Sequence, residues 1–494
     1  MSKVKYAKAF KYLTCFSTGF AILVLELVAF RLLAPYYGVS NIVTGTIINA
    51  ILLALAAGYM FGGYFADKYK SDQLPYFIIF FAAVYLIVIY VFYKPLIHAL
   101  ADLSVMFGSA LTTIIMFFIP AVLLAFIPPY FIRAISLDTT VGKTTGIIYA
   151  ISTLGSIVGG ILTTFLFIPY LGSLNTFLIA VLVLSGVAIL GLIRFHRRAV
   201  FLMVMVLPLF FPCSPESGKF VYSGESEYNV ITIKKDARGE ALYLLLNDGK
   251  GHHSKTLDPD TMMSNDYYDD FLVAQLLSNA KHTLILGNAA GTSMRQAGYF
   301  FNNHVDGVEI DPQLSLLGRT YFGLRLNDKL KIYHEDARIF MNRNRQKYDT
   351  IIVDVYAGSP YVPFHVATLE FYEQVRNSLT ADGIVAVNIP FYSLNTELSE
   401  YFLNTIERIF PGRTYISGCV AFAFRTKINM QLLAARIDAK SAPPILKELS
   451  YTVVSDFKKV KNTNKVFTDN LAPIENLTRD ILEKGFPDYA GYHH

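Results

Sequence analysis

Four apolar runs in the second half of the chain each end in residues that could bind a nucleoside. The run "HTLILG" leads into a turn that starts at Gly287 and ends at Gly291, and the next run ends at Glu309. The two runs that follow end at Asp336 and Asp354. Ligands of doubly wound folds bind beyond the carboxyl ends of the parallel strands. The four ends therefore predict one shared site.

The types of residue at these ends favour a nucleoside without phosphates. The two oxygens of Glu309 can accept hydrogen bonds from both hydroxyls of a ribose, and Asp336 can accept one from the exocyclic amine of adenine. No Lys follows the glycine turn and no Walker pattern is present, so the sequence gives little support for phosphate binding. These features indicate S-adenosylmethionine or a relative as the ligand.

The elements that must hold these residues alternate between strands and helices. Helix-like segments separate the apolar runs "HTLILG", "VDGVEID", "KLKIYHED", "YDTIIVDVY" and "GIVAVNIP". This alternation predicts an α/β domain with a parallel, doubly wound, Rossmann-like sheet.

The composition divides the 494-residue chain into two domains, residues 1–213 and 214–494. The first is dominated by apolar residues, which predicts an all-α domain that spans a membrane several times. Apolar runs long enough for a span lie at residues 11–34, 42–66, 75–93, 109–132, 146–168 and 174–194. The net charge is +5, but many basic residues flank these runs. The sequence therefore predicts a lipid bilayer, and no nucleic acid, as a partner.

A seventh segment, residues 199–212, decides on which side of the membrane the second domain lies. Basic residues precede the first run and follow the second, fourth and sixth, which places "RFHRR" in the cytoplasm. A helix as long as the seventh segment rises only about 21 Å, short of a hydrocarbon core of about 30 Å. We therefore expect a multi-pass protein of the cell membrane with its second domain in the cytoplasm. That domain would face outward if residues 199–212 cross.

Glu26 lies within the first apolar run, where an ionisable side chain is costly and marks a candidate functional site. Arg31 and Asp67 are its candidate partners. Small residues at helical spacing predict close packing between the helices. They include Gly58, Gly62, Gly155 and Gly159.

Seven stretches of the second domain occur in an order typical of one enzyme family. They are "SEYNVITI", "LNDGKGHH", "YYDDFLVAQLL", "LILGNAAG", "VEID", "HEDARIF" and "YDTIIVD". In these stretches the chain resembles the spermidine synthase family of aminopropyltransferases. With "LVLELVAFRLLAPYYG" and "TDNLAPIENL" it is also similar to the transmembrane bacterial branch of that family. The resemblance implies a β-hairpin region before the Rossmann-like sheet, and a transferase of polyamine biosynthesis.

The resemblance also implies roles for individual residues. Glu309 would bind the ribose, Asp336 and Ala337 the adenine, and Asp354 would accept a proton in catalysis. The last role fits the chemistry, because an amine with a pKa of about 10 is protonated at neutral pH and needs a base before it attacks a sulfonium-bound carbon. Further candidates are Gly287, Gly291 and His252 for the donor, and Tyr268, Asp270 and Tyr356 for the amine.

The sequence departs from the family pattern at several pocket positions. The loop Asp that faces the aminopropyl end of the donor is replaced by Ala290, and the second Asp of the Asp-x-x-Asp-Pro loop by Ala357. The hairpin Gln is replaced by His252, and the helix His and Glu by Asp269 and Asp270. Decarboxylated and intact S-adenosylmethionine therefore both stay open as the donor.

Two classes of function fit these features. The first is a membrane-bound transferase that moves an aminopropyl group from decarboxylated S-adenosylmethionine to a small amine acceptor. Its alternative among enzymes is a methyltransferase or another enzyme that uses S-adenosylmethionine. The second class is a transporter or sensor whose adenosyl-binding domain is not catalytic.

We expect no metal site and consider a homo-oligomer. Adjacent residues of a strand point to opposite faces, so His252 and His253 cannot chelate one ion together. The three cysteines are scattered without metal-ligand spacing.

Overall fold

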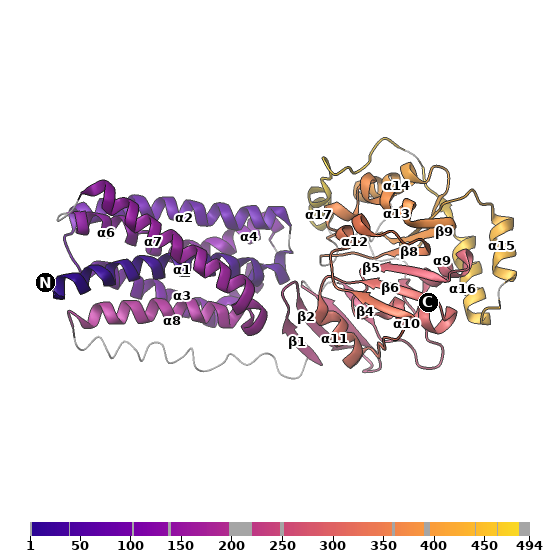
Figure 1. Cartoon of the computed structure of the whole chain (residues 1–494), viewed down its shortest axis with the longest axis horizontal. Coiled ribbons are helices and arrows are strands. Elements are labelled where there is room, and N and C mark those ends of the chain that lie inside the picture. Colours follow the sequence, from indigo (N-terminus) through magenta and orange to yellow (C-terminus); the bar gives the residue numbers. More distant parts are fainter. Residues whose placement is uncertain are drawn as a thin grey trace. The chain divides into compact units, whose positions relative to one another are not determined.

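A computed structural model describes residues 2–38, 40–100, 103–136, 140–196, 220–247, 251–357, 361–389, 396–439, 441–461 and 463–483. The chain divides into two compact units. One comprises residues 1–217 and 224–227, and the other comprises residues 218–223 and 228–494. Figure 1 shows a helical first unit and an α/β second unit. The predicted seventh segment, residues 199–212, lies outside the described residues.

The first unit consists of long helices (Figure 1). They are α1 (Ser2–Tyr37), α2 (Asn41–Lys68), α3 (Leu74–Leu100), α4 (Val105–Thr113), the π-helical turn η1 (Ile114–Phe118), α5 (Ile119–Ala125), α6 (Ile127–Ser136), α7 (Val141–Leu162), the π-helical turn η2 (Thr163–Phe167) and α8 (Ile168–Ile193). By length and composition, five helices among the described residues could cross a membrane. They are Tyr6–Tyr37, Asn41–Lys68, Leu74–Leu100, Val105–Ser136 and Val141–Ile193.

The fifth of these helices contains two of the six predicted spans. It has 53 residues, about twice the length needed for one crossing. Gly172 interrupts it with a φ of 78°, a conformation that helical residues do not adopt. The predicted spans 146–168 and 174–194 lie on the two sides of this break.

The predicted close packing through small residues is confirmed within the first unit. A Cβ atom at Gly58 would lie 2.6 Å from the Cβ atom of Ala125, and one at Gly159 would lie 2.7 Å from the carbonyl oxygen of Phe20. Such contacts leave no room for a larger side chain. The helix pairs α1/α7 and α2/α5 therefore approach backbone to backbone.

The second unit is built on an eight-stranded sheet with the order β12-β10-β11-β9-β8-β5-β6-β7. The strands are β5 (His282–Leu286), β6 (His304–Val308), β7 (Leu330–Tyr333), β8 (Tyr348–Val353), β9 (Leu379–Asn388), β10 (Thr414–Ser417), β11 (Val420–Phe424) and β12 (Lys458–Lys459). The five predicted runs form β5 to β9 and pair in parallel. Beyond the five predicted strands, β10, β11 and β12 extend one edge by antiparallel pairing, which makes the sheet mixed.

Helices cover both faces of this sheet, which confirms the doubly wound, Rossmann-like prediction (Figure 1). On β8, Ile351 and Val353 pack on one side while Ile352 packs on the other. One face holds α12 (Ala337–Arg343), α13 (Leu369–Ser378) and α14 (Glu397–Ile409). The other holds α9 (Asp270–Ser278), α10 (Thr292–Phe301), α15 (Met430–Asp438) and α16 (Pro444–Ser455). The remaining helices are α11 (Pro312–Tyr321) and α17 (Ile474–Glu483).

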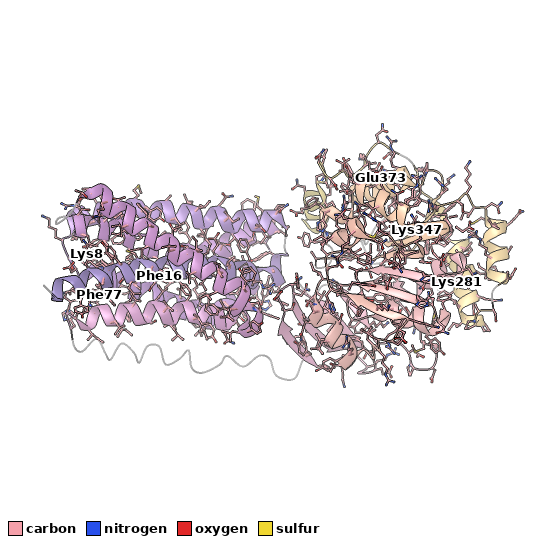
Figure 2. The ribbon with its side chains drawn as sticks, viewed as in Figure 1. Lys8, Phe16, Phe77, Lys281, Lys347 and Glu373 are labelled. Carbon is pink, nitrogen blue, oxygen red and sulfur yellow. The ribbon has the colours of Figure 1, made fainter. Side chains whose placement is uncertain are left out.

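A four-stranded antiparallel sheet precedes this core, as the predicted hairpin region requires. Its strands are β1 (Tyr222–Glu225), β2 (Val230–Lys235), β3 (Leu242–Leu246) and β4 (His252–Lys255), paired in that order. Ile231 and Leu244 pack against Ala289, Ala290 and α11. The small sheet therefore supports the glycine turn from one side. Charged side chains such as Lys281, Lys347 and Glu373 point outward from the second unit (Figure 2).

Candidate active site

The turn after β5 lies directly against the end of β8. Gly287 has a φ of 85°, and a Cβ atom there would collide with the carbonyl oxygen of Asp354. Gly291 has a φ of 89° and precedes the first residue of α10. Only glycine adopts both conformations without strain. The two glycines thus bring the turn and Asp354 together, as the strand-end argument predicts.

Glu309 follows β6 and is 7 % exposed. Its Oε2 accepts from the backbone N–H of Ala289 at 2.7 Å, and its Oε1 accepts from the N–H of Asp311 at 3.0 Å. Burial raises the pKa of Glu309 to about 7, although these two hydrogen bonds lower it. A carboxylate has about four acceptor positions, so each oxygen keeps the capacity to accept a further hydroxyl. This geometry fits a vicinal diol.

Asp336 caps the N-terminus of α12. Its Oδ1 accepts from the N–H groups of Arg338 and Ile339 at 2.8 and 3.1 Å, and its Oδ2 lies 3.1 Å from Nε2 of His365. The hydrogen bond from His365 lowers the pKa of Asp336. The N–H of Ala337, the first residue of α12, has no acceptor among the described residues. A ligand that uses both positions would compete with His365 for Oδ2 and accept from Ala337.

Asp354 follows β8 and receives two side-chain hydrogen bonds. Nδ2 of Asn388 donates to its Oδ1 at 2.8 Å, and the hydroxyl of Tyr267 donates to its Oδ2 at 3.2 Å. Burial raises the pKa of Asp354 to about 6, although both hydrogen bonds oppose the shift. The group is therefore largely ionised at neutral pH, yet basic enough to take up a proton.

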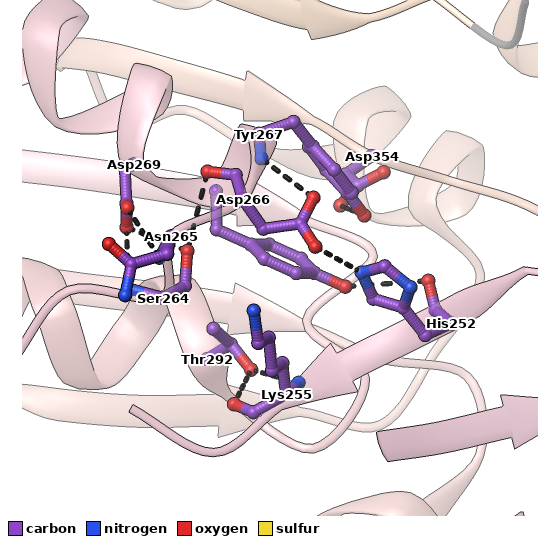
Figure 3. Close-up of polar contacts among 10 residues, drawn as sticks. His252, Lys255, Ser264, Asn265, Asp266, Tyr267, Asp269, Thr292 and Asp354 are labelled. Carbon is purple, nitrogen blue, oxygen red and sulfur yellow. Dashed lines mark hydrogen bonds and ion pairs between the residues drawn. The ribbon is translucent and has the colours of Figure 1, made fainter. Parts of the chain in front are cut away.

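His252 on β4 lies beside this carboxylate pocket. Its Nε2 is 2.8 Å from Oδ2 of Asp266 (Figure 3), and its ring contacts those of Tyr267 and Tyr268. Burial opposes the ionised form of Asp266, but the hydrogen bond and charge of His252 hold the pKa of Asp266 below its usual value. The predicted donor-binding residue His252 is thus held by a carboxylate that the sequence analysis did not single out.

The tyrosines predicted to bind the amine, Tyr268 and Tyr356, donate to backbone carbonyls and not to Asp354. Tyr268 is 2 % exposed and its hydroxyl donates to the carbonyl of His252 at 3.5 Å, whereas the adjacent Tyr267 reaches Asp354. The hydroxyl of Tyr356 donates to the carbonyl of Asn388 at 3.2 Å. Tyr267 is therefore the tyrosine that contacts the predicted base.

The two aspartates that follow Tyr268 have different surroundings. Asp269 is 5 % exposed and accepts from Ser264 and Asn265 (Figure 3) and from Gln296, so it is not a solvated residue at a helix start. Asp270 has no hydrogen-bond partner among the described residues. Burial, with nearby aspartates, raises the pKa of Asp270 to about 7. Asp270 is therefore the carboxyl that is free to bind a cation.

Asparagines connect the small sheet to the strand ends. Nδ2 of Asn229 donates to Asp311 at 2.8 Å. Nδ2 of Asn247 donates to Asn229 at 3.1 Å and to the carbonyl of Ala357 at 2.9 Å. The loops after β6 and β8 are thus braced against one hairpin.

The turn itself carries no carboxylate near Asp354. Ala290 is fully buried, and its N–H donates to Oγ of Ser254 at 2.9 Å. Within the part of the chain that the structure describes, no group of three or more His, Cys, Asp or Glu side chains could hold a metal.

Comparison with known proteins agrees with this arrangement. Residues 271–433 match the family described as the spermine/spermidine synthase domain. The chain is 28 % identical over 298 residues to a probable polyamine aminopropyl transferase of Bifidobacterium longum, covering 55 % of this chain and 65 % of that protein. It is 24 % identical over 402 residues to polyamine aminopropyltransferase 2 of Aquifex aeolicus, covering 75 % and 77 % of the two chains.

The chain thus spans about 65 % of the length of the relative from Bifidobacterium longum. Among solved structures, the spermidine synthase from Thermotoga maritima matches with a TM-score of 0.38 and 18 % identity, over 48 % of this chain and 84 % of that one.

The matched range contains Glu309, Asp336, Asp354 and Asn388, whereas the His252–Asp266 pair precedes it. Sequence reasoning missed Asp266, Tyr267, Asn388 and His365. Asn388 ends the fifth parallel strand, so the strand-end argument could have found it. His365 lies in a short 3-10 turn, η5 (Phe364–Val366), within the connection between β8 and α13, and Asp266 lies in a loop. No periodic pattern marks either residue.

Proposed function

We propose that the protein is a membrane-bound aminopropyltransferase that uses decarboxylated S-adenosylmethionine as the donor and a small amine as the acceptor. The observation that carries this proposal is the position of Asp354, a buried carboxylate at the strand end that touches the glycine turn. The relatives named polyamine aminopropyltransferases support it.

The residues around Asp354 can perform the proposed transfer. Asp354 would take the proton from the acceptor ammonium, and its negative charge would hold that cation beforehand. The freed nitrogen lone pair then forms a bond to the propyl carbon attached to the sulfonium. The carbon–sulfur bond breaks, and its electron pair stays on sulfur to give methylthioadenosine. Tyr267 and Asn388 would fix the carboxylate in place through their hydrogen bonds.

The donor site would use the other strand ends. Glu309 would accept from the two ribose hydroxyls, while Asp336 and the N–H of Ala337 would contact adenine. Gly287 and Gly291 allow the backbone to approach the donor closely. His252 lies next to this region, and Tyr268, Asp270 and Tyr356 would line the amine side.

A second candidate reaction is methyl transfer from intact S-adenosylmethionine. It is favoured by Ala290, because the buried turn offers no carboxylate that would repel the carboxylate of the intact donor. We place it second because Asp354 and Asp270 provide two carboxyls on the side proposed for a cationic acceptor.

We also propose that the first unit spans the cell membrane and that the second unit lies in the cytoplasm, where the donor is made. Large apolar side chains on α2 support a lipid-facing surface, with 56 % exposure at Leu52, 64 % at Leu53 and 65 % at Met60. A homo-oligomer is compatible with this arrangement.

Product analysis distinguishes these reactions. Purified full-length protein is incubated with decarboxylated or intact S-adenosylmethionine and a panel of di- and triamines, and products are identified by mass spectrometry. We expect an aminopropylated amine and an equal amount of methylthioadenosine from the decarboxylated donor only. A methylated amine from the intact donor would establish the second candidate, and absence of any product would favour a non-catalytic adenosyl sensor.

A further inference from the structure

Glu26 is an isolated carboxyl group within the long helix α1. It is half-buried, and among the described residues it has no hydrogen-bond or ion-pair partner. Both partners expected from the sequence are engaged elsewhere. Asp67 pairs with Arg133 at 2.9 Å, and the guanidinium of Arg31 donates to the backbone carbonyl of Ser226. An ionisable side chain at such a position needs another source of compensation.

The packing of α1 on α7 determines what faces Glu26. The backbone of Phe16 closes on Gly155, the backbone of Phe20 lies against Gly159, and Leu23 lies against Gly160. Oγ of Ser156 donates to the carbonyl of Gly19 at 3.0 Å (for the helices, see Figure 1).

The residue numbers in these four contacts rise together, so the two helices run parallel. The pairs 16/155, 19/156, 20/159 and 23/160 differ by 139, 137, 139 and 137 positions. Glu26 continues the same helical face, because it is three residues beyond position 23. A Cβ atom at Gly19 would also meet the backbone of Ser152, an offset of 133. The two contacts nearest to Glu26, 20/159 and 23/160, have offsets of 139 and 137, and these place Glu26 level with residues 163–165 of η2.

Thr163 at the start of η2 has an unmet hydrogen-bonding capacity. Its side chain is fully buried, and its hydroxyl has no partner among the described residues. A buried hydroxyl without a partner costs free energy that water or a ligand can recover.

The π-helical turn adds a backbone acceptor at the same level. In a π-helix the hydrogen bonds run over one more residue than in an α-helix, and such turns occur frequently at functional sites. The other π-helical turn, η1, shows how a carbonyl there is used, since the hydroxyl of Tyr85 donates to the carbonyl of Ile115 at 2.5 Å. No described side chain bonds a carbonyl of η2 in this way.

From this geometry we propose that Glu26, Thr163 and the backbone of η2 form a second ligand site, which binds a primary alkylammonium group within the helical unit. The carboxylate supplies one negative charge, which matches one ammonium. The three acceptors match its three N–H donors. Calcium and magnesium ions take about six or more oxygen ligands, which this set does not supply. The residues of this site belong to the first unit and Asp354 belongs to the second, and the inference does not rest on the proposed transferase activity.

Binding stoichiometry tests this site on the full chain in detergent. Radiolabelled 1,4-diaminobutane is titrated onto the wild type, Glu26→Gln, Thr163→Val and the control Asp67→Asn, which removes a carboxylate that is already paired with Arg133. We expect Glu26→Gln to lose one equivalent of bound diamine. We expect Thr163→Val to bind that equivalent about 3- to 10-fold more weakly, because about one hydrogen bond is lost. Asp67→Asn should keep the stoichiometry of the wild type.

Two further measurements distinguish a loss of the Glu26 site from a general loss of folding or of donor binding. Methylthioadenosine affinity should be unchanged in Glu26→Gln, and Glu26→Asp should retain part of the binding. Unchanged stoichiometry in Glu26→Gln would overturn the site. Displacement of the Glu26-dependent equivalent by sodium, but not by choline at equal ionic strength, would overturn the alkylammonium assignment. Failure of product formation with intact diamine binding at Glu26 would count only against the proposed transferase.

Discussion

The carboxylate of Glu309 holds two backbone segments and keeps acceptor capacity for a diol. We expect Glu309→Ala to weaken methylthioadenosine binding about 10- to 100-fold, because charge-assisted hydrogen bonds to the ribose are lost. Isothermal titration calorimetry measures this change. Glu373→Ala, at an exposed position of α13 (Figure 2), is the matched control. Equal affinities of the two variants would remove Glu309 from the donor site.

Asp270 makes stability depend on pH. Burial and neighbouring aspartates raise the pKa of its carboxyl to about 7 in the folded chain, whereas an unfolded Asp titrates near 3.9. The folded state therefore binds the proton of Asp270 more tightly than the unfolded state does. This difference adds to the free energy of unfolding at low pH, and the contribution is lost as the pH rises from about 4 to about 7.

Asp270→Asn should consequently raise the free energy of unfolding at pH 8 by up to about 2 kcal/mol, and by less as the pH is lowered toward 4. Denaturant unfolding at several pH values measures this effect. Asp328→Asn, at an exposed site, is the control. A pH-independent effect of Asp270→Asn would contradict the assigned pKa.

The sequence predicts residues at strand ends better than residues in loops. Glu309, Asp336 and Asp354 follow buried strands, so the topology of a doubly wound sheet brings them together. Tyr267 and Tyr268 lie in one short helical turn (Tyr267–Asp269), and the orientation of that turn decides which of the two hydroxyls reaches Asp354. The sequence pattern does not determine this orientation. His365 reaches Asp336 from a separate loop, which only the tertiary fold can show.

At the scale of elements, a substitution in the turn after β5 tests whether close packing of this turn on the end of β8 is required. Gly287→Ala would place a methyl group against the backbone of Asp354 at a φ of 85°. Gly239→Ala shares the positive φ, at 79°, but has open space around it. We expect Gly287→Ala to cost about 1–3 kcal/mol more stability than Gly239→Ala and to reduce donor affinity. Similar losses in both variants would show that the turn tolerates a side chain beside β8.

The elements themselves follow the hydrophobic pattern with one exception. All five predicted parallel strands form, because each is a buried apolar run between helices. The antiparallel edge of β10 to β12 was not predicted, since an apolar run does not reveal the direction of its pairing. In the first unit, the break at Gly172 falls between the predicted spans 146–168 and 174–194, as their boundary requires.

At the scale of the whole molecule, the side of the membrane is open to a direct test. Lys281 is exposed on the second unit, so Lys281→Cys in a background without Cys15, Cys213 and Cys419 gives one reactive thiol. We expect a membrane-impermeant maleimide to label it only after intact cells are permeabilised, because the basic cluster before residue 199 favours the cytoplasm. Efficient labelling of intact cells would show that residues 199–212 cross.

The central claim is that Asp354 accepts the proton of the amine during aminopropyl transfer. The most direct measurement is the pH dependence of kcat for the wild type and Asp354→Asn with decarboxylated S-adenosylmethionine, together with donor affinity for both. We predict that wild-type kcat rises through a pH of about 6 as Asp354 ionises. Asp354→Asn should lose this limb and at least about 100-fold in kcat while donor affinity stays nearly unchanged. An Asn variant with wild-type turnover and the same pH profile would contradict the claim.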